Sequence, residues 1–193
     1  RSQVPEYACR IHVRKDVNIM MVSKGELYIP ADYTMTKSEA SALIQHEIGT
    51  HALTYYNGSQ QSLSQLSQGL ADYDTLQEGI AVLSEYLIGG LTGNRLRILA
   101  GRVLAGEALL NGADFKEVFK MLYSKYNFSK EPAFNITSRI FQSGGFLKDI
   151  IYLKGLVELR DYLIAGGDLE FLLSGKFALK HVPMVKDLTD RRL

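Results

Sequence analysis

The chain is poor in the residues that build several familiar kinds of site. Its 193 residues include one cysteine, Cys9, so they can form neither an internal disulfide nor a cysteine-rich zinc site. Any metal that these residues hold must therefore be bound by histidines and carboxylates. Histidine is also scarce, with four in the chain, so the places where two of them fall close together are informative.

A strong charge of one sign and a long apolar run are also missing. Lys and Arg total 22 against 21 Asp and Glu, a balance that gives no electrostatic basis for binding nucleic acid. No stretch approaches the roughly 18 apolar residues of a membrane span, and the first residues do not resemble a signal peptide. We therefore expect no nucleic-acid or membrane partner and a reducing, cytoplasmic setting.

The hydrophobic pattern predicts a small sheet followed by helices. Alternating residues and a Lys24-Gly25 turn indicate short strands at Ala8–Arg14, Val17–Ser23 and Glu26–Pro30. The later pattern predicts helices over 36–57, 74–89, 94–110, 114–126, 132–144, 148–165 and 168–173. We read 59–68 as a surface loop and the segment with His181 and Pro183 as a tail. The expected fold class is α+β, a small N-terminal antiparallel sheet packed on a mostly helical, zincin-like domain.

One motif carries chemistry, and its spacing is unusual. Residues 46–51 read His-Glu-Ile-Gly-Thr-His in the middle of the predicted helix 36–57. The better-known zinc-peptidase motif places its histidines at i and i+4, whereas i and i+5 diverge by about 140° on an ideal α-helix. A π-turn would return both side chains to one face, and Gly49 eases such a distortion. We therefore predict a π-turn or a widened turn around Gly49.

A catalytic zinc site needs three protein ligands and one open position. His46 and His51 supply two, and Glu78, in the sequence Gln-Glu-Gly-Ile-Ala near the start of the next helix, is the candidate for the third. Glu47 would then face the bound water as general base. Glu85, two turns beyond Glu78, is a candidate partner for a ligating imidazole. Two imidazoles and one carboxylate suit Zn²⁺ best.

The two motifs together resemble a known family. They are similar to those of the bacterial flavohaemoglobin expression-modulating QEGLA-motif proteins. They are also similar to those of the eukaryotic microtubule-associated tyrosine carboxypeptidases, which remove the C-terminal tyrosine of α-tubulin. A later segment, Lys-Asp at 148–149 with Tyr-Leu-Lys-Gly at 152–155, resembles the family's late motif. The resemblance implies the same ligands and base. It further implies that Arg139 and Lys148 meet a substrate carboxylate and that Tyr152 assists at the scissile carbonyl.

These observations predict a zinc-dependent peptide hydrolase, and the resemblance adds that it is a carboxypeptidase acting on a peptide or protein C-terminus. We expect residues 1–193 to be a single metallopeptidase-like catalytic domain cut from a longer chain. We also expect an edge strand, with the strand that ends at 28–30 as the candidate, to hold an extended peptide by strand addition. The alternative is a metal-binding regulatory or interaction protein without significant peptidase activity.

Simpler roles for the same residues remain open. The histidine motif can arise by chance, and Glu78 can be a carboxylate that stabilises a helix N-terminus. Glu85, Arg139 and Lys148 can be ordinary surface charges, and Tyr152 can be a core residue.

Overall fold

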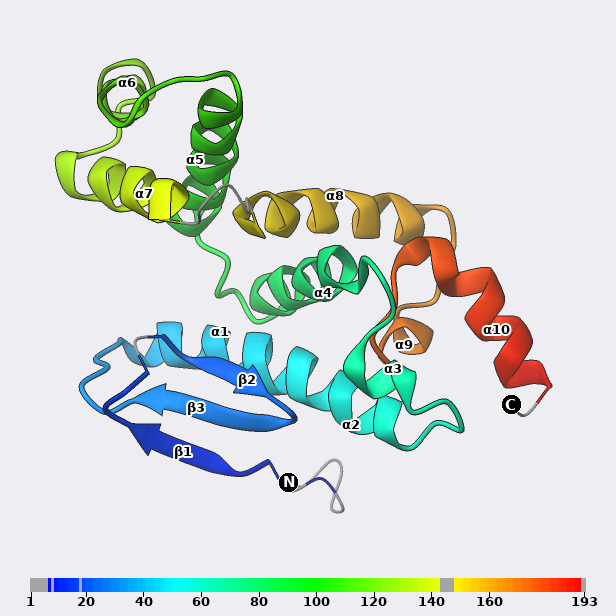
Figure 1. The fold of residues 1–193 in the computed structure, drawn as a ribbon. Coiled ribbons are helices and arrows are strands. Elements are labelled where there is room, and N and C mark those ends of the chain that lie inside the picture. Colours follow the sequence, from blue (N-terminus) through cyan, green and yellow to red (C-terminus); the bar gives the residue numbers. More distant parts are fainter. Residues whose placement is uncertain (1–6, 8, 18, 143–147, 192–193) are drawn as a thin grey trace. The chain divides into compact units, whose positions relative to one another are not determined.

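The computed structural model describes residues 7, 9–17, 19–142 and 148–191. These residues form two compact units: Arg1–Gly90 with Gly155–Leu193, called unit 1, and Leu91–Lys154, called unit 2 (Figure 1). Both units are mostly helical, and the sheet lies in unit 1, so the α+β class is confirmed. The expectation that both units make one catalytic domain stays a prediction.

Unit 1 contains three strands and most of the helical segments. The strands are β1 (Ile11–Arg14), β2 (Met21–Ser23) and β3 (Glu26–Pro30). The helical segments are α1 (Lys37–His46), η1 (Glu47–Ala52), α2 (Leu53–Ser59), α3 (Gln65–Gln68), α4 (Tyr73–Leu87), α9 (Leu169–Leu172), η4 (Leu179–His181) and α10 (Val182–Asp190). Helix α8 (Ile151–Ile164) begins in unit 2 and belongs to unit 1 from Gly155 onward.

The sheet is mixed, so its expected antiparallel character is wrong for one of the two pairings. Its order is β1-β3-β2, with β2 antiparallel to β3 and β1 parallel to β3. The hairpin at Gly25 produces the antiparallel pair, and β3 then inserts between the other two strands. The reason is burial, since β3 carries Leu27, which is 2% exposed, and the most buried strand takes the centre. The expectation that the strand ending at 28–30 is an edge strand is therefore wrong, and among the described residues the outer strands are β1 and β2.

The helix that carries the histidine motif begins at a capping box and runs through three segments. Thr36 accepts a hydrogen bond from the Glu39 N–H, and the Glu39 carboxylate accepts one from the Thr36 N–H, as the sequence predicts. The chain then continues through α1, η1 and α2 without a break. Segment η1 packs against β2, β3 and α4, which places the motif between the sheet and the next long helix.

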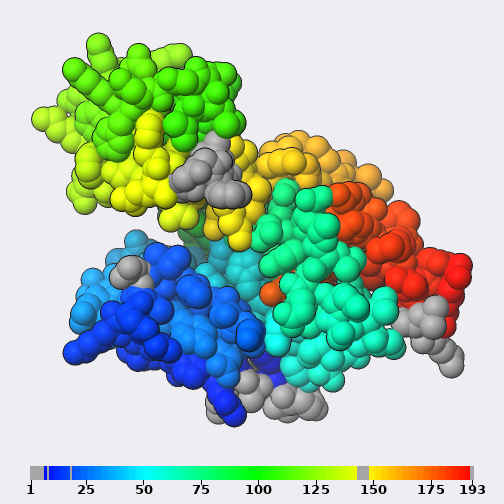
Figure 2. Space-filling model, in the orientation of Figure 1, coloured from blue at the N-terminus to red at the C-terminus, as the bar shows by residue number. Residues whose placement is uncertain are grey.

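The core of unit 1 joins segments that lie far apart in the sequence. The C-terminal part of the chain lies beside the residues around position 70 (Figure 2). Backbone hydrogen bonds link them, from the Leu70 N–H to the Lys176 carbonyl and from the Lys176 N–H to the Leu66 carbonyl. The buried apolar residues of this core are Leu66, Leu76, Ile80, Leu159, Leu172, Phe177, Val182 and Val185.

Two segments differ from the sequence-based expectation. The predicted loop 59–68 ends in the short helix α3, in which Leu66 is buried. The predicted tail contains α10, with Pro183 in its first turn. A proline there needs no N–H partner and fits the helical φ, so the residue that suggested a break starts a helix instead.

Unit 2 is a helical unit with its own core. Its segments are α5 (Gly93–Leu110), α6 (Phe115–Lys120), η2 (Met121–Lys125), α7 (Lys130–Gln142) and η3 (Lys148–Ile150). Asp114 and Glu117 form the predicted capping box of α6. The core consists of Ala105, Val118, Leu122, Phe128, Ala133, Ile136 and Ile140. In the part of the chain that the structure describes, no helix is both long and apolar enough to cross a membrane.

Candidate metal centre

The predicted π-turn around Gly49 is confirmed. Residues Glu47–Ala52 form a π-helical segment, and the Leu53 N–H that follows donates to the Ile48 carbonyl, five residues back. The extra residue in this turn offsets the divergence of two side chains at i and i+5. The rings of His46 and His51 consequently lie together, with centroids 5.1 Å apart and planes at 75°.

Helix α4 brings a carboxylate to the two imidazoles. One nitrogen each of His46 and His51 and one oxygen of Glu78 all lie within 4.8 Å of one another, and together they could hold a metal ion. Glu78 Oε2 is 3.4 Å from His46 Nε2 and 3.6 Å from His51 Nε2. His46 is 5% exposed and Glu78 8%, whereas the His51 side chain is 17% exposed, so the cluster is mostly buried and reaches water on the side of His51.

The other nitrogen of His46 has a partner of its own. His46 Nδ1 lies 2.7 Å from Glu85 Oε1, and Glu85 is 3% exposed. A neutral His46 that donates its Nδ1 proton to Glu85 presents a lone pair at Nε2. That lone pair points towards the carboxylate of Glu78, an arrangement that repels unless a proton or a cation lies between them.

One oxygen of Glu78 shows whether these residues fit a metal. Glu78 Oε2 is buried and accepts no hydrogen bond. A buried carboxylate oxygen without a hydrogen bond carries a large desolvation cost, which a cation beside it, a metal ion or a protonated imidazole, would offset. The donor set of two imidazole nitrogens and one carboxylate oxygen is that of a zinc-type site, with an imidazole oriented from behind by Glu85. The residues therefore fit a zinc ion.

The electrostatics of the metal-free cluster point in the same direction. Burial by itself lowers the pKa of His46, but contacts with Glu78 and Glu85 and the charge of Glu47 outweigh it and raise that pKa to about 9. Burial raises the pKa of Glu78, but the two imidazoles outweigh it and lower that pKa to about 2. Without a metal, a proton on His46 therefore serves as the neutralising cation.

Glu47 lies beside the cluster and is held by the sheet. Its Oε2 accepts a hydrogen bond of 3.1 Å from the backbone N–H of Val22 on strand β2. Burial raises the pKa of the Glu47 carboxyl above its usual range, while the neighbouring His51 and His46 oppose that rise. Sequence reasoning could not identify Val22 as a contributor, because its backbone rather than its side chain makes the contact.

The remaining two histidines have structural partners. His12 Nε2 lies 2.9 Å from Glu26 Oε2, and its ring stacks on Tyr28. His181 Nδ1 accepts a hydrogen bond from the Ala178 N–H at the start of η4. Neither belongs to the His46, His51 and Glu78 cluster.

The residues that the family resemblance alone implicates, Arg139 and Lys148 in substrate binding and Tyr152 in catalysis, belong to unit 2. Arg139, on α7, donates from Nε to both oxygens of Asp149, at 2.7 and 2.8 Å. Arg102 donates to the same carboxylate at 3.0 Å, so one buried Asp serves two guanidinium groups. Lys148 begins η3, and Tyr152 lies in the first turn of α8. Their contact with a substrate stays a prediction.

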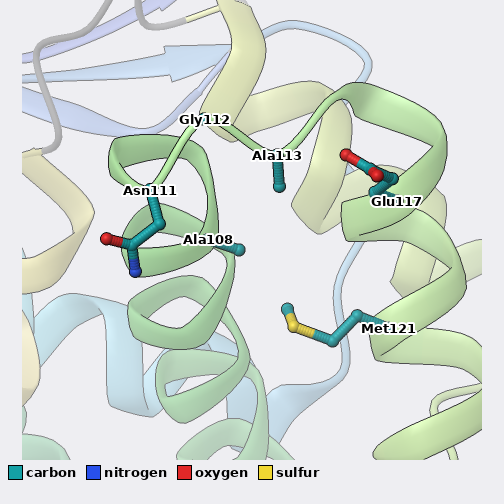
Figure 3. Close-up of a pocket in the computed structure, with 6 residues that line it drawn as sticks. All are labelled: Ala108, Asn111, Gly112, Ala113, Glu117 and Met121. Carbon is teal, nitrogen blue, oxygen red and sulfur yellow. The ribbon is translucent and has the colours of Figure 1, made fainter.

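Unit 2 also has a pocket of about 470 Å³, which none of the candidate site residues lines. Figure 3 shows its lining residues, Ala108, Asn111, Gly112, Ala113, Glu117 and Met121. The single ionisable group among them, Glu117, accepts a hydrogen bond from the Asp114 N–H and caps α6. The pocket therefore brings together no set of groups that could carry out chemistry.

Comparison with known proteins identifies one relationship. The family model described as microtubule-associated tyrosine carboxypeptidase matches residues 1–193, the whole chain. Neither a search of curated proteins nor a search of solved structures finds a match.

Proposed function

Because the chain belongs to the microtubule-associated tyrosine carboxypeptidase family, we propose that it is a zinc-dependent carboxypeptidase that acts on the C-terminus of a peptide or protein. The observation that carries the proposal is the convergence of His46, His51 and Glu78 within 4.8 Å at a confirmed π-turn. The substrate class rests on the family alone.

Three residues would hold the zinc, and each has a distinct support. His46 would bind through Nε2 while Glu85 fixes its ring from Nδ1, and His51 would bind through Nε2 from the end of the π-turn. Glu78 would bind through Oε2, the oxygen that accepts no hydrogen bond. A zinc ion at this place would polarise the scissile carbonyl and make a water molecule acidic enough to attack at neutral pH.

Glu47 is the proposed general base. In the proposed reaction its carboxylate takes a proton from the attacking water, and it then passes that proton to the amine that leaves as the peptide bond breaks. The Val22 N–H holds Oε2 of Glu47, which leaves Oε1 for the water. The residue is 8% exposed, so the proton it carries is shielded from bulk solvent during the reaction.

The substrate carboxylate needs a positive partner, and Arg139 and Lys148 are the proposed ones. Arg139 is already oriented by Asp149, and its side chain is 44% exposed, so part of its guanidinium stays accessible. Arg102 adds a second positive charge at the same Asp149, which leaves that group of charges positive overall. Tyr152 is the proposed donor to the scissile carbonyl.

The alternative is a protein that binds metal without hydrolysis. A structural zinc site has four protein ligands, whereas the cluster found among the described residues has three. A structural metal also has no need of a buried carboxylate such as Glu47 beside it. Both features favour the catalytic proposal.

The test begins with metal content, measured by mass spectrometry on the purified protein and on a Glu78→Ala variant. We expect close to one zinc per parent chain and a large loss in the variant. A parent chain that neither contains zinc nor takes it up on addition would overturn the proposal. The second step is a cleavage assay on a library of peptides with free C-termini, with Glu47→Gln as control. This variant should keep its zinc and lose activity by roughly 10²- to 10⁴-fold.

A further inference from the structure

The contact between the motif helix and α4 is polar well beyond the metal cluster. Thr54 Oγ1 lies 2.7 Å from Gln77 Oε1, and Thr50 Oγ1 lies 3.1 Å from Ser84 Oγ. Thr50 and Thr54 are 0% exposed and Gln77 is 1% exposed. Two packed helices would normally bury apolar residues at such places, because a buried polar group is costly unless it is paired. The burial of apolar surface therefore does not explain why polar residues stand at these positions.

The positions of one pair in the sequence suggest an explanation. Gln77 directly precedes the proposed ligand Glu78, and Thr54 lies three residues after the proposed ligand His51. The Thr54–Gln77 contact therefore ties the end of the π-turn to the residue next to the third ligand. This 2.7 Å contact fixes how far the π-turn lies from α4, the two segments that must bring their ligand atoms to one ion.

The π-turn needs a support of this kind, because Gly49 does not enforce it. Gly49 is not among the residues with a positive φ, so its backbone conformation is open to other residues. A Cβ added there would meet the tip of the flexible Gln45 side chain, at 2.6 Å from Oε1. An α-helical alternative is therefore open to residues 47–52 on local grounds, so packing against neighbouring elements, α4 among them, must select the π form.

Hydrogen-bond accounting shows how Gln77 can act on the turn. Thr54 Oγ1 lies 2.7 Å from the Gln77 amide oxygen and also within reach of two carbonyls of the turn, Thr50 at 2.8 Å and His51 at 3.2 Å. One hydroxyl proton cannot serve three acceptors, and Gln77 Nε2 is buried without a partner. Both difficulties are reduced if the Gln77 amide is turned by 180°. Its N–H₂ then donates to Thr54, and the Thr54 hydroxyl donates to the turn, where it has two carbonyl acceptors instead of three acceptors in all. The amide oxygen takes the place without a partner.

We propose that Gln77, acting through the Thr54 hydroxyl, is a positioning residue that holds the π-turn in place before any metal binds. It keeps His51 facing Glu78, so the metal enters a preformed site. This inference rests on the proposed function, because it assigns the pair a role in that same metal site.

The test compares variants that remove the contact with one that keeps it. Thr54→Val has nearly the shape of the parent side chain without the hydroxyl, Thr54→Ser keeps the hydroxyl, and Gln77→Met keeps the length without the amide. Zinc affinity is measured by competition with a chelator, and site geometry by the visible absorption of the cobalt-loaded protein. Thr54→Val and Gln77→Met should each weaken zinc binding by roughly 10- to 100-fold and alter the cobalt spectrum. Thr54→Ser should stay close to the parent in both.

The double variant Thr54→Val with Gln77→Met gives a sharper criterion. If the two residues act as one unit, the double variant should bind zinc no more weakly than the worse single variant. A merely structural role would lower the unfolding midpoint without changing the cobalt spectrum. Folded Thr54→Val with the zinc affinity and cobalt spectrum of the parent would overturn the proposal.

A second measurement needs no variant and covers the case in which a substitution prevents folding. In the metal-free parent chain, the amides of residues 51–55 should already be protected against hydrogen exchange. If they exchange freely and become protected only on adding zinc, the metal makes the turn and the proposal is wrong. A parent chain that binds no zinc would instead overturn the proposed function, so the two failures are distinguishable.

Discussion

At the residue scale, the metal-free cluster is an ion pair whose partners titrate in opposite directions. The pKa of His46, raised to about 9 from an unfolded value near 6.5, contributes stability that is fully present below pH 6.5 and is lost as the pH rises through 9. The pKa of Glu78, lowered to about 2, contributes stability that is present above about pH 4.5 and is lost as the pH falls towards 2.

We therefore predict that the thermal unfolding midpoint of the chelator-treated protein decreases as the pH is raised from 6.5 to 9. The stabilisation that zinc adds should grow over the same interval, because the metal no longer competes with a proton for His46. Calorimetry of the metal-free and zinc-loaded protein across this range checks both trends. Glu78→Gln, which cannot form an ion pair with an imidazolium, should weaken the metal-free trend and leave the part that Glu85 and Glu47 contribute, and an undiminished trend in this variant would contradict the assignment.

Also at the residue scale, one backbone N–H positions the general base. Leu27 directs its N–H to the Arg10 carbonyl, so the Val22–Leu27 pair of β2 and β3 is not hydrogen-bonded, and the Val22 N–H is free to serve Glu47. Val22→Pro would therefore remove the contact to Glu47 without removing a ladder bond, and edge strands tolerate proline at such places.

We predict that Val22→Pro lowers kcat for peptide cleavage by roughly 10- to 100-fold while zinc affinity stays close to that of the parent. Val22→Ala, which loses the side chain and keeps the N–H, is the matched control and should remain near the parent in kcat. Steady-state kinetics with zinc content measured on the same samples decides the matter. An unchanged kcat in folded Val22→Pro would show that Glu47 does not need this contact.

At the scale of elements, helix α4 is fixed from behind by the close approach of two glycines. A Cβ on Gly155 of α8 would lie 1.9 Å from the Thr75 carbonyl oxygen, and a Cβ on Gly79 of α4 would lie 2.4 Å from the Gly155 carbonyl carbon. Both obstacles are backbone, which cannot rotate away. The helix that supplies Glu78 therefore depends on glycine at both positions.

Gly155→Ala should accordingly lower the free energy of unfolding by about 1–3 kcal/mol, the usual cost of overpacking, or by more. Gly93→Ala, at the start of α5, is the matched control, because a Cβ there meets nothing within 4 Å and its φ is not positive. It should leave stability unchanged or slightly raised. Urea unfolding measures both, and equal midpoints for the two variants would contradict the argument.

The comparison of sequence and structure at this scale shows what local patterns can predict. The i, i+5 spacing of His46 and His51 predicts the π-turn because helix geometry is a local property, and the capping box at Thr36 is local in the same way. The order of the strands is not a local property, since it depends on which strand is buried, and β3, the strand that ends at 28–30, becomes the central strand rather than an edge strand. The helix that contains Pro183 is absent from the sequence-based prediction because proline suits a first turn as well as a break.

In the candidate site too, the sequence predicts the features that depend on local spacing and misses those that depend on packing. The spacing and residue types of the two motifs predict the side chains that converge, and the structure brings His46, His51, Glu78 and Glu85 together. The Val22 N–H leaves no trace in the sequence, because every residue except proline carries that group. The pairing of Gln77 with Thr54 depends on how two helices pack, which no local pattern specifies.

At the scale of the whole molecule, each unit has a core of its own, and the proposed metal ligands all belong to unit 1. Metal binding stabilises the structure that holds the ligands, so chelation should act on unit 1. We predict that removing zinc increases hydrogen exchange in α4 and η1 and leaves α5 and α7 nearly unchanged, because their core contains no ligand.

Hydrogen exchange followed by mass spectrometry on peptic peptides, with and without chelator, provides the measurement. The Glu78→Ala variant is the control, since its exchange should resemble that of the chelated parent and should not respond to added zinc. If α5 and α7 lose protection together with α4, the two units unfold as one cooperative structure. That outcome would favour the single catalytic domain expected from the sequence, and the predicted independence of unit 2 would be wrong.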